Sequence, residues 1–185
     1  NEAATLLKTG VNHKSVMSGP MAEVVFDSLQ YLTDADISAM ITYLQAIPVT
    51  KADNVSALDQ ALSEPDRNEQ TKKQMMQQGA ALYRTHCMDC HGTQGEGFAS
   101  VYPALKGNPG LQMNSIANPL RIILAGGFAP VTQLNPRPYS MPPFGPVLSD
   151  GEVAILLSYI RNSWGNKATF VNAAEVNHYR TVPMD

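Results

Sequence analysis

The sequence predicts an all-α fold, and three observations lead to this prediction. Several segments repeat apolar residues with the period of one buried helix face, and helix-capping residues stand just before two of them. No segment with the alternation of a strand is long enough to found a sheet. The 13 glycines and 13 prolines among 185 residues predict long loops between the helices rather than a simple bundle.

Two of the expected helices follow the same plan. Thr33 and Ser149 are natural N-caps, and Glu152 stands at capping-box spacing from Ser149. A methionine in a Gly/Pro context, Met21 in the first copy and Met141 in the second, precedes each helix. The apolar positions of the two helices are Ile37, Met40, Ile41 and Leu44, and Val153, Leu156, Leu157 and Ile160.

This internal repeat predicts the domain organisation. Only the second copy has a cysteine motif upstream, so we interpret residues 1–48 as the C-terminal part of an incomplete domain. The polar segment 49–70 is interpreted as a linker, because it lacks a sustained apolar period. Residues 71–165 then form a complete domain, and 166–185 a polar C-terminal extension.

Within the complete domain, the predicted order is helix, cysteine motif, loop, helix, methionine loop and helix. The expected segments are a helix at 72–85, a loop at 102–109, a short helix at 119–125 and a proline-rich loop at 131–146.

The only two cysteines lie in Cys87-Met88-Asp89-Cys90-His91. This spacing is typical of covalent haem c attachment, because two thiols reach the two vinyl groups of one haem while His91 is held where it can bind the iron. Two other interpretations stay open. A thioredoxin-like dithiol belongs near a βαβ pattern, which is missing here, and a zinc site would need His86 as a further ligand from the same short stretch.

Met141 is the predicted sixth ligand of the iron, because it lies in a rigid, proline-flanked loop just before the last helix. Met113 and His86 are the alternatives. By the same logic Met21 would ligate a second haem, one that this chain does not itself attach. An iron closed by His and Met transfers electrons and does not bind substrate. Arg121 is a candidate partner of a haem propionate, or else a solvated helix residue.

Electron transfer is therefore the favoured function, and whether the chain is an enzyme on its own is left open. A rival is a catalytic haem c enzyme that oxidises a sulfur compound or reduces peroxide, which requires a displaceable sixth ligand and an acid or base nearby. A binding module built on the loop at 131–146 is a third alternative.

The balance of 13 basic and 16 acidic residues, with no basic cluster, argues against a nucleic-acid partner. The chain has no apolar run of about 18 to 20 residues that could cross a bilayer, and any targeting signal is expected to have been removed.

The motif and its surroundings resemble a class I cytochrome c. The resemblance rests on Gly79 with Tyr83, the cysteine motif, Tyr102-Pro103-Ala104-Leu105, Met141-Pro142, and Leu156 with Tyr159. It implies that the first and last helices cross at the small residue and the aromatics, and that the Pro103 carbonyl accepts a hydrogen bond from the proximal His91.

Longer segments resemble the cytochrome subunits of bacterial membrane-bound alcohol, gluconate and sorbitol dehydrogenases. These are YRTHCMDCHGTQGEGFASVYPALKGNP, LRIILAGG, YSMPPF, LSDGEVAILLSYIRNSWGN, and, in the first copy, GPMAEVV with SLQYLTDADISAMITYLQAIP. The resemblance implies electrons taken from a flavin- or quinoprotein dehydrogenase and passed to the quinone pool or a terminal oxidase. It also implies a place in the periplasm, at the outer face of the inner membrane. The chain departs from that family in having one haem motif instead of three, so either it is a fragment or another chain completes residues 1–48.

Overall fold

The computed structural model describes residues 2–48, 68–98 and 101–181, so most of the predicted linker lies outside the described residues. Over these ranges the sheet structure is limited to two antiparallel two-residue strands, β1 (Gly127–Phe128) and β2 (Ser140–Met141), in which Gly127 pairs with Met141. The predicted all-α fold is confirmed. No helix in the described part of the chain combines the length and apolar character needed to traverse a bilayer.

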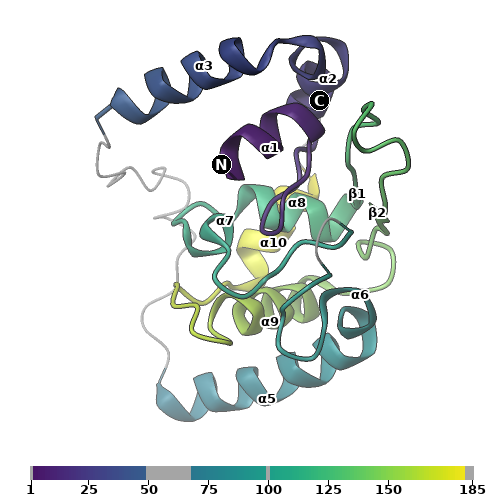
Figure 1. Cartoon of the computed structure of the whole chain (residues 1–185). Coiled ribbons are helices and arrows are strands. Elements are labelled where there is room, and N and C mark those ends of the chain that lie inside the picture. Colours follow the sequence, from purple (N-terminus) through teal and green to yellow (C-terminus); the bar gives the residue numbers. More distant parts are fainter. Residues whose placement is uncertain (1, 49–67, 99–100, 182–185) are drawn as a thin grey trace.

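The helices fall into two groups along the chain (Figure 1). The N-terminal group contains α1 (Glu2–Thr9), α2 (Pro20–Asp27), the 3-10 helix η1 (Leu29–Tyr31) and α3 (Asp34–Ala46). The second group contains α5 (Glu69–His86), α6 (Met88–His91), α7 (Pro109–Gln112), α8 (Ala117–Ala125), α9 (Asp150–Arg161) and α10 (Ala173–Thr181).

The second group is organised by the contact between α5 and α9. Gly79 makes this contact possible, since a Cβ added there would lie 2.4 Å from the Tyr159 Cβ and 2.9 Å from the Ile155 carbonyl oxygen. One turn further along α5, the Tyr83 ring packs against Tyr159 and Trp164, with ring centroids 5.7 and 4.9 Å apart. The crossing expected from the cytochrome c resemblance is confirmed.

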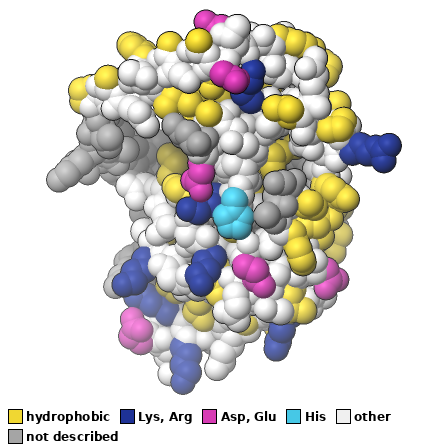
Figure 2. Space-filling view, viewed as in Figure 1, with side chains coloured by type: hydrophobic (Ala, Val, Ile, Leu, Met, Phe, Trp, Pro, Cys, Tyr) yellow, Lys and Arg dark blue, Asp and Glu magenta, His cyan; other side chains and the backbone are white. Residues whose placement is uncertain are grey.

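The N-terminal group has a small apolar core of its own. Five buried side chains form it: Leu7, Val25, Leu29, Ile37 and Ile41. Leu44, which the periodicity placed on the same buried face, is instead 53% exposed. Figure 2 shows hydrophobic side chains gathered over the helices at the top of the molecule, and this group contributes exposed Val24, Phe26, Tyr31, Tyr43 and Ile47. Two separate cores agree with two units, and the interpretation of 1–48 as part of an incomplete domain stays a prediction.

The two helices of the internal repeat, α3 and α9, each begin with a capping box. The Ser149 hydroxyl accepts a hydrogen bond from the backbone of Glu152, as predicted, and the Thr33 hydroxyl accepts one from the backbone of Asp36. The capping box at Thr33 was not predicted, because it uses the shorter side chain of Asp36 where the usual pattern has Glu or Gln.

The C-terminal extension contains a helix that the sequence analysis did not predict. α10 packs on α9, where Val176 is fully buried. Arg180 joins it to the beginning of α9, because its guanidinium donates to the Asp150 carboxylate at 2.6 Å and to the Gly145 and Leu148 carbonyls. Hydrogen bonds from Asn177 and Arg180 hold the pKa of Asp150 below its ordinary value of 3.8.

Replacing Gly79 by Ala should destabilise the fold by about 1–2 kcal/mol, because the added methyl meets the backbone of α9 and outweighs the better helix propensity of Ala. Chemical denaturation of the Gly79→Ala variant measures this loss. Gly151→Ala is the matched control, since nothing lies within 4 Å of a Cβ at that helical position. Equal stabilities of the two variants would contradict the proposed close contact.

Replacing Arg180 by Met should cost about 1–2 kcal/mol at neutral pH, because half-buried acceptors lose a charged donor. A carboxyl whose pKa is lower in the folded chain than in the unfolded chain stabilises the fold at pH values above its unfolded pKa. This stabilisation is lost as the pH falls through the folded pKa. The native chain should therefore lose more unfolding free energy between pH 5 and pH 3 than Arg180→Met, measured by urea titration at each pH. Lys167→Met, in the same extension, should retain the native pH dependence.

Candidate haem-binding site

The cysteine motif folds as one helical turn directly after α5. Cys87 ends α5 by donating its backbone N–H to the Tyr83 carbonyl, and its own carbonyl accepts from the His91 N–H. Because α6 is a single helical turn, Cys87, Cys90 and His91 stand at positions i, i+3 and i+4, which share one face. Gly92, with φ of 79°, then turns the chain away. The Cys87 side chain is buried, and that of Cys90 is half-buried.

This face lines a cavity of about 650 Å³. Its walls include both cysteines, His91, Pro103 and Met141. The remaining wall is mostly apolar, with contributions from Leu105, Leu111, Ile123, Leu156, Leu157 and Ile160. A volume of this size, walled by apolar side chains with a few polar groups, is typical of a site for a cofactor.

His91 is oriented by a hydrogen bond to backbone. Its Nδ1 lies 3.0 Å from the Pro103 carbonyl oxygen, and since a carbonyl can only accept, Nδ1 carries the proton. Burial lowers the pKa of His91, against the opposing effect of this hydrogen bond. The neutral ring therefore keeps a lone pair on Nε2, which is the form that binds a metal.

Met141 enters the cavity from β2. Its backbone is held by pairing with Gly127 and by close contact with Gly126, where a Cβ would lie 2.5 Å from the Met141 carbonyl oxygen. Gly126 also has a φ of 77°, a conformation that favours glycine. The methionine loop is thus fixed by backbone contacts on the side next to α8.

The other predicted ligands lie in different surroundings. Met113 is 56% exposed and does not belong to the cavity wall. His86 is half-buried, lines the cavity and lies edge-on to the Phe144 ring. Met21, expected at a second haem, lines this same cavity and is 42% exposed. Met17, also in the wall, was not singled out in the sequence, because its place depends on how the N-terminal segment docks.

Arg121, the candidate partner of a haem propionate, and the aromatic residue Trp164 lie outside the cavity wall. Arg121 is exposed on α8 and does not line the cavity, an arrangement that agrees with a solvated helix residue. Trp164 packs against Tyr83 and Tyr159, and a Cβ at Gly95 would lie 2.6 Å from its ring.

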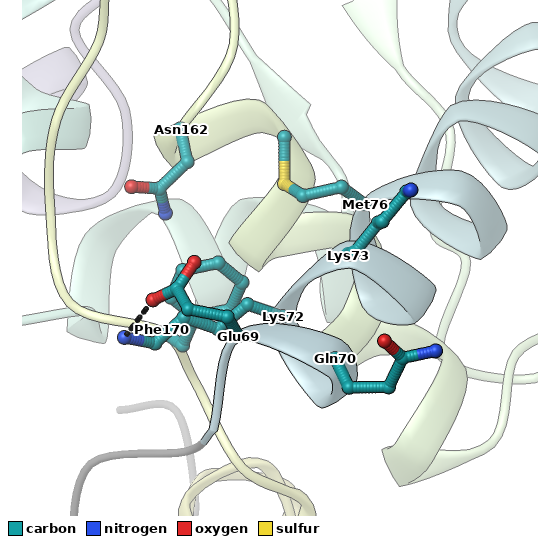
Figure 3. Close-up of a pocket in the computed structure, with 7 residues that line it drawn as sticks. All are labelled: Glu69, Gln70, Lys72, Lys73, Met76, Asn162 and Phe170. Atoms are coloured by element: carbon teal, nitrogen blue, oxygen red, sulfur yellow. Dashed lines mark hydrogen bonds and ion pairs between the residues drawn. The ribbon is translucent and has the colours of Figure 1, made fainter.

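A second hollow lies at the beginning of α5 (Figure 3). Five of its seven lining residues have polar or charged side chains, and Lys72 Nζ lies 3.3 Å from the Glu69 carboxylate. From Met76, its lining residue nearest to the cysteine motif along α5, the helix rises about 16 Å to Cys87. The hollow contains no thiol or imidazole, so it offers none of the chemistry found in the cavity. Over the described ranges, no three His, Cys, Asp or Glu side chains come together as a metal-binding group.

The donor set of the cavity fits haem c. Two thiols and an imidazole on one helical turn face an apolar space, and a thioether enters it from another loop. A zinc ion would not need this large apolar volume, whereas a porphyrin fills it with apolar surface.

The comparisons with known proteins agree with this geometry. Residues 76–164 match the family model described as "Cytochrome c". Over 95% of its length the chain is 34% identical to the cytochrome c subunit of the quinone alcohol dehydrogenase of Gluconacetobacter polyoxogenes. It is 32% identical to the fructose dehydrogenase cytochrome subunit of Gluconobacter japonicus, and 34% identical to the gluconate 2-dehydrogenase cytochrome c subunit of Pantoea cypripedii, each over 94% of the chain.

The chain covers 37%, 38% and 39% of the lengths of these three relatives. The resemblance to dehydrogenase cytochrome subunits is confirmed by these identities. Residues 76–164 form a cytochrome c domain with the mostly α-helical fold that the sequence predicts.

Proposed function

We propose that this chain is an electron-transfer haem protein in which Cys87 and Cys90 hold one haem c covalently, and His91 and Met141 are the two iron ligands. One observation carries the proposal: these four side chains line a single apolar cavity, although Met141 is 50 residues away from His91 along the chain. When bound, the haem would supply an iron that changes its oxidation state by one electron.

The protein's own residues would bind, orient and shield this group. The Pro103 carbonyl keeps the proton on Nδ1 of His91, so that Nε2 is the atom free to ligate. The Tyr83 hydroxyl donates to the Gly92 carbonyl at 2.6 Å and holds the end of the motif turn. The apolar wall excludes water and favours the less charged state of a metal site. A thioether ligand acts in the same direction, since Met ligation raises the reduction potential.

A dehydrogenase with a flavin or quinone cofactor is the proposed electron donor. The support is the likeness to cytochrome subunits of quinone alcohol, fructose and gluconate dehydrogenases. The quinone pool or a terminal oxidase is the proposed acceptor, and the periplasm, at the outer face of the inner membrane, is the proposed location. In this proposal the chain conducts electrons and has no chemical reaction of its own.

Residues 2–48 are proposed to be the end of a second cytochrome c-like domain, in which Met21, although it lines the same cavity as Met141 here, would ligate a second haem. The support is the repeated plan, in which a methionine precedes a capped helix in both copies.

The rival function, a catalytic haem c enzyme, is supported by one observation. His86 lines the cavity and would provide the acid or base that the sequence alone did not place near Met141. Such an enzyme needs a sixth ligand that leaves the iron, so the state of Met141 separates the two functions.

The first test is the absorption spectrum of the full chain, matured with covalent haem. We expect one covalent haem per chain, a low-spin spectrum, and in the ferric state the weak far-red band of sulfur ligation. Met141→Ala should lose that band, become high-spin and have a lower reduction potential, because the thioether that would favour ferrous iron is removed. Met113→Ala is the matched control and should keep the native spectrum, since Met113 lies outside the cavity wall.

A high-spin spectrum of the native chain would reject Met141 ligation and favour the catalytic alternative. In that case His86→Ala should reduce turnover with peroxide. An intact far-red band in Met141→Ala would assign the ligand to another thioether of the wall, Met17 or Met21.

A further inference from the structure

Residues 10–17 form a tight hairpin between α1 and α2. Val11 and Val16 pair across it, and the Asn12 side-chain oxygen accepts from the backbone N–H groups of Lys14 and Ser15 at 2.8 and 2.7 Å. These two bonds fix the turn at His13 and Lys14. In Figure 1 the segment descends from α1 toward the loop that precedes α7.

The tip of the hairpin is hydrogen-bonded to the cytochrome domain. The His13 carbonyl accepts from the Ala104 N–H at 2.8 Å, and the Lys14 carbonyl accepts from the Asn108 side-chain amide. The Asn108 side-chain oxygen accepts from the Gly110 N–H at the start of α7, so this anchor is itself held in place.

The peptide group between Pro103 and Ala104 takes part in two hydrogen bonds. The Pro103 carbonyl accepts from His91 Nδ1 at 3.0 Å, and the Ala104 N–H donates to the His13 carbonyl at 2.8 Å. Ala104 is only 2% exposed, so within this fold its N–H has no ready substitute partner in water. The two hydrogen bonds therefore form a chain through one peptide unit, from His13 to His91.

Hydrogen bonds in such a chain polarise one another. A peptide whose N–H is engaged presents a more negative carbonyl oxygen, and a stronger acceptor at Nδ1 raises the electron density of the imidazole. A more electron-rich imidazole favours the more oxidised form of a metal that it ligates.

We propose that the hairpin at 10–17 is a positioning element for the proximal ligand: the His13 carbonyl, acting through the Ala104 N–H, fixes and polarises the Pro103 carbonyl that orients His91, and so lowers the reduction potential of the site. The inference rests on the proposed function in one respect, that His91 ligates the iron. It assigns to the N-terminal unit a role in the electron-transfer properties of the neighbouring domain.

The test uses the full haem-loaded chain and the variant Asn12→Ala, which removes the acceptor that folds the hairpin tip. Asn12→Asp keeps that acceptor and should rescue the native properties. Thr42→Ala, on the exposed side of α3, is the control within the same unit. Two quantities are measured: the hydrogen-exchange rate of the Ala104 amide by NMR in the ferrous state, and the midpoint potential by optical redox titration.

We expect the Ala104 amide of Asn12→Ala to exchange about tenfold faster, as for the loss of one net hydrogen bond. The midpoint potential should shift upward, and the His91 Nδ1 proton resonance should shift as its acceptor weakens. The Asn12→Asp and Thr42→Ala variants should match the native chain in all three quantities.

Faster exchange of the Ala104 amide with an unchanged potential would overturn the proposal. If Asn12→Ala leaves that amide protected, a chain whose residues 11–16 are replaced by six Gly and Ser residues supplies the comparison, and a native potential there would equally overturn it. Failure of the proposed function has a different signature, namely absence of covalent haem or of imidazole ligation in every chain, including the native one.

Discussion

The close contact between α5 and α9 is the constraint on which the rest of the site depends. With only a hydrogen at Gly79, the two helices approach until the Tyr159 side chain and the backbone at Ile155 touch α5. This approach places the cysteine turn, which follows directly from the end of α5, over the apolar face of α9 that forms one wall of the cavity. A chemically local motif thus gains its apolar surroundings from a helix more than 60 residues later in the chain.

The site also joins two parts of the chain that have separate cores. The cytochrome domain supplies the cysteine turn, the Pro103 carbonyl and the Met141 loop, whereas residues 14–18 and α2 add a further stretch of wall. The backbone carbonyls of His13 and Lys14 accept hydrogen bonds from the Ala104 N–H and the Asn108 side-chain amide, and these bonds fasten this stretch to the loop around Pro103. The immediate environment of His91 therefore includes groups from both units, so neither unit alone determines it.

Features that depend on local chemistry could be predicted from the sequence. The helix of residues 150–161, its cap at Ser149 and the grouping of Cys87, Cys90 and His91 on one turn follow from spacing alone. Features that depend on docking could not. α10 has too few apolar residues for a periodic signal, and it is ordered by burial of Val176 and by the contacts of Arg180. The position of Met21 beside the same cavity as Met141 likewise follows from the docked hairpin.

The burial of Cys87 makes the two thiols of the cysteine motif unequal. Removal from water, with the neighbouring Cys90 adding to the effect, raises the pKa of its thiol to about 12. A thiol reacts through its thiolate, so the closed fold keeps Cys87 in its least reactive form. Cys90 is only half-buried, so it is the more accessible thiol of the pair. The fold therefore divides two cysteines that are equivalent in the motif into a buried position and an accessible one.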